Sequence, residues 1–134
     1  MKIADFDFDS LETSNPNGET ASTASLGSIV AQFAAIASEY PNRIAIEDEA
    51  DSVSFDLLDR QSNQIANFIV ELKLPDAAMI GVMTGRNRHY IAAILGVLKS
   101  GHAFVPLDPN VPLIRRIAIA RNAVTPLILA DAKH

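Results

Sequence analysis

The chain contains no cysteine, only three histidines and no long apolar run. The absence of cysteine excludes disulfide bonds, a thiolate nucleophile and zinc sites built from cysteine. The histidines are His89, His102 and His134, and no two of them stand three or four residues apart, the spacing that places two ligands on one face of a helix. We therefore expect no metal site and assign no metal ligand.

Nothing in the sequence predicts a membrane segment or an export signal. A membrane-spanning helix needs about 18 or more apolar residues in succession, and the chain has no such stretch. The start Met-Lys-Ile-Ala is followed at once by acidic residues rather than by the apolar core of a signal peptide. We predict a cytoplasmic protein without a membrane partner.

The negative charge is concentrated near the amino terminus. The net charge is −5, and residues 1–25 hold five acidic residues against Lys2, so that the remaining residues carry only −1. A nucleic-acid-binding domain would instead show a basic patch. We predict no nucleic-acid partner.

The 134 residues, 49% of them hydrophobic, suit at most one globular domain. Residues 1–25 form an acidic Ser/Thr-rich lead-in that lacks any core-forming period, and we predict that it is flexible. Phe6 and Phe8 alternate with acids within it, so a short docking segment, for a partner or for the body itself, is the alternative. The body is predicted to span residues 26–134.

Helices and strands alternate along the body. Apolar spacing predicts helices over residues 28–39, 54–72, 87–99 and 113–123, and strands over residues 43–47, 78–83, 103–105 and 126–130. Ser54 and Asn87 are placed to cap two of these helices. This alternation predicts an α/β fold with a mainly parallel sheet, flanking helices and right-handed crossovers.

Several charged residues are interpreted as surface or turn residues. Glu47, Asp48, Glu49 and Asp51 suit a solvated hairpin turn, and Asp108 a turn between two prolines. In the helix over 54–72, the polar residues Asp59 and Asn63 are assigned to faces away from the core. The arginines of the helix over 113–123 are assigned to its surface; they are Arg115, Arg116 and Arg121.

The loop from Gly81 to Arg86 follows a predicted strand and precedes a helix, which is where a phosphate-binding loop would lie. It matches neither Gly-x-Gly-x-x-Gly nor Gly-Lys-Ser/Thr, so we interpret it as a plain turn with Arg86 and Arg88 in solvent. His102 is interpreted as a loop side chain reaching solvent, with a titrating contact to a substrate as the alternative.

The most informative stretch is residues 98–109, Leu-Lys-Ser-Gly-His-Ala-Phe-Val-Pro-Leu-Asp-Pro. Lys99 lies in the last turn of a helix, where a cation complements the helix dipole, and Gly101 can adopt the left-handed conformation that ends it. A short strand and two prolines follow. The stretch closely resembles the second core motif of the amino-acid adenylation domains of nonribosomal peptide synthetases.

A second block supports this resemblance. Residues 53–58, Val-Ser-Phe-Asp-Leu-Leu, and residues 62–66, Ser-Asn-Gln-Ile-Ala, are similar to the first core motif and the segment that follows it. The similarity covers residues 28–131. The chain departs from the family pattern at Leu57 and Ile114, where glutamate is usual, and at Val111, where tyrosine is usual.

The resemblance implies a partial N-terminal subdomain of the adenylate-forming fold. A complete family member would be an ATP-dependent ligase that activates an amino acid as aminoacyl-AMP with Mg-ATP and loads a carrier-protein thiol. The matched stretch ends before the family's Ser/Thr/Gly-rich phosphate loop and its other catalytic segments. We therefore expect this chain to be inactive alone, with no catalytic and no cofactor-binding residues and no cofactor of its own.

Its expected partners are the remainder of the adenylation domain, a carrier protein and, through an exposed sheet edge, a second copy. The alternatives are a noncatalytic scaffold or interaction module derived from such a domain, a fragment of an acyl-CoA synthetase-like ligase, and a complete small nucleotide-binding domain.

Overall fold

The computed structural model describes residues 2–5 and 28–132. A four-stranded parallel sheet forms its centre, in the order β1-β6-β4-β5. Its strands are β1 (Lys2–Asp5), β4 (Met79–Met83), β5 (Ala103–Pro106) and β6 (Leu127–Ala130). The predicted α/β class with a mainly parallel sheet is confirmed.

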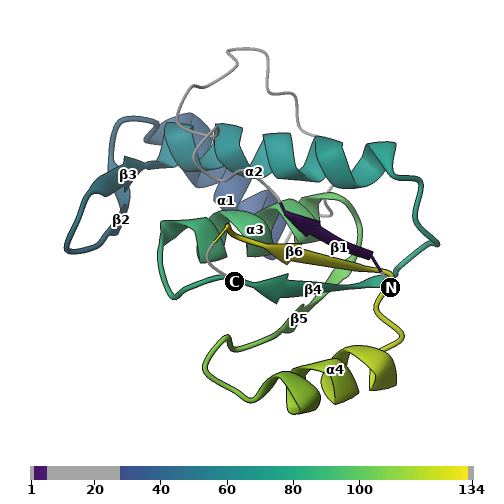
Figure 1. The fold of residues 1–134 in the computed structure, drawn as a ribbon. Coiled ribbons are helices and arrows are strands. Elements are labelled where there is room, and N and C mark those ends of the chain that lie inside the picture. Colours follow the sequence, from purple (N-terminus) through teal and green to yellow (C-terminus); the bar gives the residue numbers. More distant parts are fainter. Residues whose placement is uncertain (1, 6–27, 133–134) are drawn as a thin grey trace.

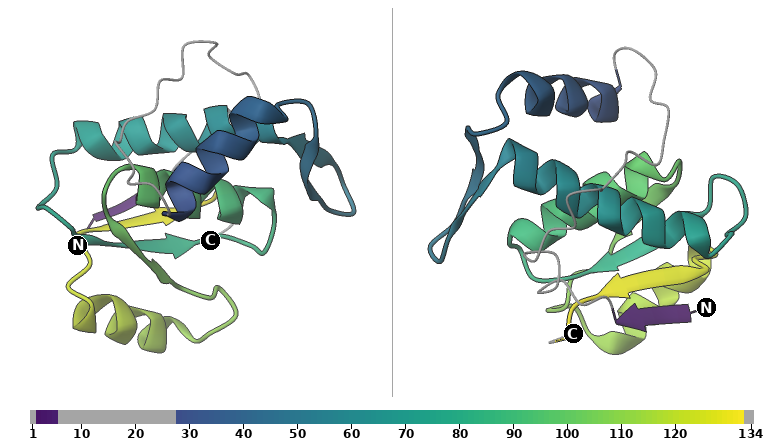
Figure 2. Two further views of the ribbon diagram at one scale, coloured as in Figure 1. Left: turned by 180° about the vertical axis from the view of Figure 1, so that it is seen from behind. Right: turned by 90° about the horizontal axis from the view of Figure 1, so that it is seen from above.

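Helices cover both faces of this sheet (Figure 1). The helices are α1 (Ile29–Glu39), α2 (Phe55–Glu71), α3 (Arg88–Lys99) and α4 (Leu113–Asn122). The first three lie on one face, where α2 packs along α3, and α4 lies on the other (Figures 1 and 2). The molecule therefore has three layers.

Alternation along the strands separates the core into two parts. In β4, Ile80 and Val82 pack among the residues of α2 and α3, whereas Met83 belongs to the cluster beneath α4. In β6, Leu127 and Leu129 face the first side, and Ile128 and Ala130 face α4. Both strands are thus buried on two faces, as is usual for strands in the middle of a parallel sheet.

The close packing of α2 on α3 depends on a glycine. A Cβ atom on Gly96 would lie 2.5 Å from Cγ2 of Ile65 and 2.6 Å from its Cβ. No real pair of carbon atoms approaches so closely without a shift in structure. Gly96 therefore fixes how near the two helices come.

A small antiparallel hairpin stands apart from the main sheet. It consists of β2 (Ile44–Glu47) and β3 (Ser52–Ser54). At its turn, Asp48 accepts hydrogen bonds from the backbone N–H groups of Ala50 and Asp51, each at 2.9 Å. The predicted solvated hairpin is confirmed.

Local signals account for the starts of α1, α2 and α3. Ser28 caps α1 through the N–H of Ala31 at 3.0 Å, and Ser54 caps α2 through the N–H of Leu57 at 3.1 Å. Asn87 caps α3 as predicted. Side-chain oxygens there accept hydrogen bonds from donors that have no partner within the helix.

The sequence did not predict β1. Lys2–Asp5 pair in parallel with β6, with Lys2 opposite Leu127 and Asp5 opposite Ala130. These four residues carry no turn or apolar signal that separates them from the acidic stretch after them. The rest of the lead-in, including Phe6 and Phe8, lies outside the described residues, and its flexibility stays a prediction.

Candidate functional site

The carboxyl ends of β4, β5 and β6 meet at one edge of the sheet. From this edge, the chain after β4 enters α3 on one face, whereas the chain after β5 enters α4 on the other. In open parallel sheets, ligands bind in the crevice between two strands whose connections leave toward opposite faces. The candidate site is therefore the crevice between the ends of β4 and β5.

A hollow of about 90 Å³ occupies this crevice. It is lined by Thr84, Arg86 and Tyr90 after β4 and by residues 106–109 after β5. A broader hollow of about 460 Å³ adjoins it, between the β2–β3 hairpin and the start of α3. Arg86 and Tyr90 line both, so the two hollows adjoin, and together they are called the depression below.

Hydrogen bonds within the loops hold the walls of this depression. Asn87 Oδ1 accepts from the N–H groups of His89 at 3.0 Å and Tyr90 at 3.3 Å. Asp108 Oδ1 accepts from the N–H of Asn110 at 2.9 Å and from its Nδ2 at 3.0 Å. The predicted roles of Asn87 as a cap and Asp108 as a turn residue are both confirmed.

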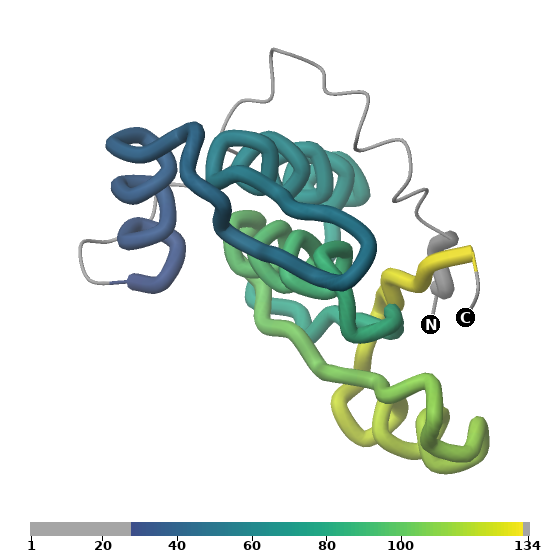
Figure 3. The backbone as a smooth tube through the Cα atoms, turned by 90° about the vertical axis from the view of Figure 1, so that its left-hand side faces the viewer, coloured from purple at the N-terminus to yellow at the C-terminus, as the bar shows by residue number. Residues whose placement is uncertain are grey.

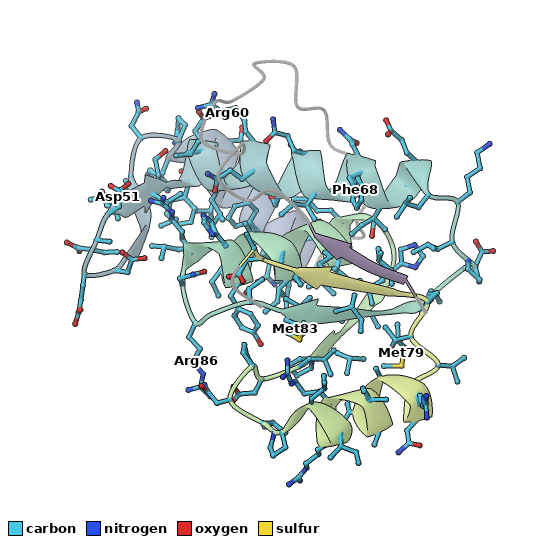
Figure 4. The ribbon with its side chains drawn as sticks, in the orientation of Figure 1. Asp51, Arg60, Phe68, Met79, Met83 and Arg86 are labelled. Carbon is cyan, nitrogen blue, oxygen red and sulfur yellow. The ribbon has the colours of Figure 1, made fainter. Side chains whose placement is uncertain are left out.

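The two arginines after β4 differ from each other. Arg86 is exposed, as predicted, and extends from the loop at the end of β4 (Figure 4). The prediction that Arg88 is solvated was wrong. Its Nη1 lies 2.7 Å from Asp51 Oδ2, and only 18% of its side chain is exposed. This ion pair connects the hairpin to α3, a long-range contact that no local pattern reveals.

His102 reaches solvent only in part, less than the simpler interpretation expected. The residue is half-buried, and among the described residues no group forms a hydrogen bond with its buried Nδ1. It lies between α3 and β5, at the amino end of the sheet, away from the candidate crevice. His102 therefore cannot contact a ligand bound in that crevice.

Lys99 has an environment that its position near a helix end did not predict. The residue does lie in the last turn of α3, as predicted, but its side chain is fully buried. Its Nζ donates to Asp59 Oδ1 at 2.6 Å, to Asn63 Oδ1 at 2.7 Å and to the Asp59 carbonyl at 3.3 Å. The assignment of Asn63 to a face away from the core was therefore wrong, because the residue is buried, whereas the side chain of Asp59 is still 29% exposed.

Burial lowers the pKa of Lys99 from its ordinary value, while the hydrogen bond and the negative charge of Asp59 act in the opposite direction. The ring of Phe33 also lies 5.3 Å from Nζ. Lys99 thus joins α3 to α1 and α2. Its position shows a structural role, remote from the candidate crevice.

The crevice is lined by several polar side chains that could bind or orient a ligand. Its walls present the guanidinium of Arg86, the phenol of Tyr90 and the carboxylate of Asp108. The Asp108 carboxylate already accepts hydrogen bonds from Asn110 within its turn. Within residues 28–132, no cluster of three or more side chains of the kinds that ligate metals is present. None of the helices in the described ranges is long and apolar enough to cross a membrane.

Comparison with known proteins identifies the family. The family model described as "AMP-binding enzyme" matches residues 33–134. The chain belongs to this family. The match includes both motif blocks and every element from α2 to β6.

The relatives are peptide synthetases. The chain is 31% identical over 113 residues to tyrocidine synthase 2 of Brevibacillus parabrevis, covering 84% of this chain and 3% of that protein. It is 38% identical over 76 residues to the nonribosomal peptide synthetase kk1B of Curvularia clavata, covering 57% of this chain and 1% of the relative. The chain therefore corresponds to a small part of each.

A solved structure agrees with these relatives. Holo-PA1221, described as an NRPS protein containing adenylation and PCP domains, superposes with a TM-score of 0.70 at 29% identity. The superposition covers 75% of this chain and 18% of that one. The described body is thus a piece of the adenylation-domain fold, as the two motif blocks predicted.

Proposed function

We propose that this chain builds the N-terminal scaffold of an adenylation domain that, when complete, activates an amino acid with Mg-ATP as aminoacyl-AMP. The domain would then load the amino acid on a carrier-protein thiol in the cytoplasm. The named relatives are peptide synthetases, which favours an amino acid over the substrate of an acyl-CoA synthetase-like ligase.

One observation carries the scaffold role: the residues of both motif blocks contact other parts of the chain's own fold. In the first block, Ser54 caps α2. In the second, Lys99 is buried against Asp59 and Asn63, and Gly101 ends α3 with a φ of +83°. A residue engaged in this way holds elements together and leaves no reactive atom for a substrate.

We assign no catalytic, cofactor-binding or metal-binding residue to this chain. Stabilising charge at a transferring phosphoryl group requires several positioned cations and hydrogen-bond donors. The candidate crevice presents one exposed guanidinium, that of Arg86. The remainder of the adenylation domain would have to supply the other groups.

Amino-acid-dependent ATP–pyrophosphate exchange tests this proposal. The purified chain, assayed with each of the common amino acids, should give no exchange above a blank without protein. A complete adenylation domain assayed in parallel is the positive control. Exchange by the chain alone would contradict the proposal, and tight ATP binding in calorimetry would support a complete nucleotide-binding domain instead.

Self-association through the exposed sheet edge stays a prediction. The strand concerned is β5, which pairs with β4 on one side only within the described residues. It is four residues long and ends in Pro106, which lacks a backbone donor. Both properties weaken β5 as a template for a further strand.

A further inference from the structure

The β2–β3 hairpin has a fixed base and an exposed outer part. Val53, near the base, is 1% exposed and belongs to the core cluster of α2 and α3. Residues 47–52 are all exposed, and they are called the tip below. The pairing of the two strands is irregular between Ile44 and Ile46, where the register shifts. Burial therefore holds the base of the hairpin in place but not the tip.

An ion pair joins the tip to α3. Asp51 Oδ2 lies 2.7 Å from Nη1 of Arg88, the first residue of α3. The other hydrogen bonds of the tip lie within the hairpin, where Asp48 Oδ1 accepts from the N–H groups of Ala50 and Asp51, and Asp51 Oδ1 accepts from that of Ser52. Among the described residues, no further hydrogen bond or ion pair connects the tip to an element outside the hairpin.

The hairpin also forms one wall of the depression. The hollow of about 460 Å³ is lined by residues 46–48 on the hairpin side and by residues 86–88, 90 and 91 on the side of α3. The hairpin projects beyond the start of α3, and in Figure 3 it lies across the ends of α2 and α3. Asp51 and Arg86 lie on the same side of the molecule (Figure 4). The position of the tip therefore sets how wide the hollow is.

Charge favours the closed position of the tip. Four carboxylates lie between residues 47 and 51, and the wall opposite carries Arg86 and Arg88. The side chain of Arg88 is 18% exposed and that of Asp51 is 58% exposed, so water and salt weaken their attraction. A pair this open shifts an equilibrium by only a few-fold. The closed position is thus favoured without being fixed.

We propose that the tip is a movable wall of the depression. The Arg88–Asp51 ion pair holds it against α3, and loss of the pair lets the tip swing outward about the buried base and widen the hollow. Local opening is expected where residues are exposed and few buried contacts oppose it. The device controls access to the candidate crevice whichever ligand enters, so it does not depend on the proposed adenylation activity.

Three single variants of the full chain test the role of the ion pair. Asp51→Asn removes the charge that faces Arg88 and keeps a side-chain oxygen for the N–H of Ser52. Arg88→Gln removes the other partner. Glu49→Gln is the matched control, because it removes one negative charge from the same turn and leaves the pair intact. Circular dichroism of each variant verifies that the fold is retained.

Amide hydrogen exchange measures the opening. The amide of Asp48 donates to the Asp51 carbonyl at 3.0 Å and reports on the tip. Protection factors in the tip should fall about two- to fivefold in Asp51→Asn and in Arg88→Gln. They should fall no further in the double variant, because the two residues form one interaction. Added salt should produce the same fall in the wild type but not in Asp51→Asn. The amides of β4 and the control variant should be unaffected.

Unchanged protection of the tip in Asp51→Asn would overturn the proposal, and so would an equal loss in Glu49→Gln or additive losses in the double variant. Each of these results would show that the ion pair does not hold the tip.

A distance measurement distinguishes an outward swing from fraying in place. The chain has no cysteine, so Ala50→Cys and Ile114→Cys can be spin-labelled selectively. Both positions are exposed, one in the tip and the other at the start of α4, after residues 106–109 on the far side of the depression. Pulsed electron paramagnetic resonance should show longer distances between the labels when Asp51→Asn is added, and no change when Glu49→Gln is added. An unchanged distance distribution in Asp51→Asn would overturn the swing.

Discussion

Lys99 is held in the interior by three oxygen acceptors on α2, two of them from Asp59 and one from Asn63. Its two partners differ in access to water. Asp59 is 29% exposed in its side chain, whereas Asn63 is 2% exposed. If the ammonium were removed, the carboxylate would recover hydration, and the amide oxygen of Asn63 would lose a strong donor.

Lys99→Met should therefore lower the free energy of unfolding by about 1–3 kcal/mol, the cost of leaving a buried acceptor without its donor. The loss should stay below the ~3–5 kcal/mol of a fully buried pair because Asp59 rehydrates. Urea denaturation measures it. Arg60→Met, which removes the half-exposed pair with Asp56, is the control and should cost less than about 1 kcal/mol. Equal losses for the two variants would contradict the account.

The burial of Lys99 was partly visible in the sequence. The residue follows Ala92, Leu95 and Gly96 at intervals of seven, four and three positions, so helical periodicity places it on the buried face. A lysine near a helix end is equally consistent with an interaction with the helix dipole, so periodicity alone did not decide between the two interpretations. The hydrogen-bond partners of Lys99 lie 36 and 40 positions away in the sequence. Such a pairing depends on how two helices cross, which local patterns do not contain.

At the scale of elements, the crossing of α2 and α3 sets the upper layer of the molecule. Helical propensity alone favours alanine over glycine by about 1 kcal/mol at an interior position. The contact with Ile65 acts in the opposite direction, since an added Cβ would lie only 2.5 Å from its Cγ2. The steric contact with Ile65 should outweigh the better helix propensity of alanine, because a methyl group at position 96 forces α2 and α3 apart.

Gly96→Ala should accordingly lower the free energy of unfolding by about 1–3 kcal/mol, despite its better helix propensity. Thermal or urea denaturation provides the measurement. Ile65→Ala opens a cavity and should be destabilising by itself. The double variant should lose less than the sum of the two single losses, because each change relieves the other. Strict additivity would show that the two residues do not compete for space.

Most element boundaries followed from local chemistry. Ser54, Asn87 and Gly101 mark helix ends through caps and a left-handed stop, and the structure has them in these roles. The end of α4 carries no such mark. There Val124 adopts a φ of +52°, a conformation that β-branched residues rarely take, and no sequence rule would place it there.

At the scale of the whole molecule, β1 changes which strand lies at the edge of the sheet. Without β1, β6 would be the edge strand and would expose the backbone donors and acceptors on that side. All four residues of β6 are buried in the structure. An unpaired apolar strand recruits other chains. The four residues of β1 therefore protect the molecule as well as extend the sheet.

A variant lacking residues 2–5 should remain folded, because the core of β4, β5, β6 and the helices is complete without them. Loss of the ladder with β6 should lower the free energy of unfolding by about 1–3 kcal/mol. It should also increase light scattering on prolonged incubation. Unchanged denaturation and scattering would show that β1 contributes nothing to the sheet.

The strand order was beyond the reach of the sequence, although the fold class was not. Alternating helices and strands predict a parallel sheet in any order. That β6 pairs with β4 and not with β5 follows from the placement of α4 on the opposite face from α3. The crevice between β4 and β5 depends on this reversal, so the sequence could point to the loop after β4 but not to its meeting with the loop after β5.

The strand order also has a consequence for synthesis. During translation, β4 emerges before both of its neighbours, and β6 is the last of the described strands to be made. All the other described strands therefore lie between β1 and its partner in the sequence, so residues 2–5 cannot pair until residues 127–130 have left the ribosome. Pairing between such distant segments slows folding. Until then, the apolar strand β4 depends on α2 and α3 for cover, which makes this interval the one in which a chaperone would matter most.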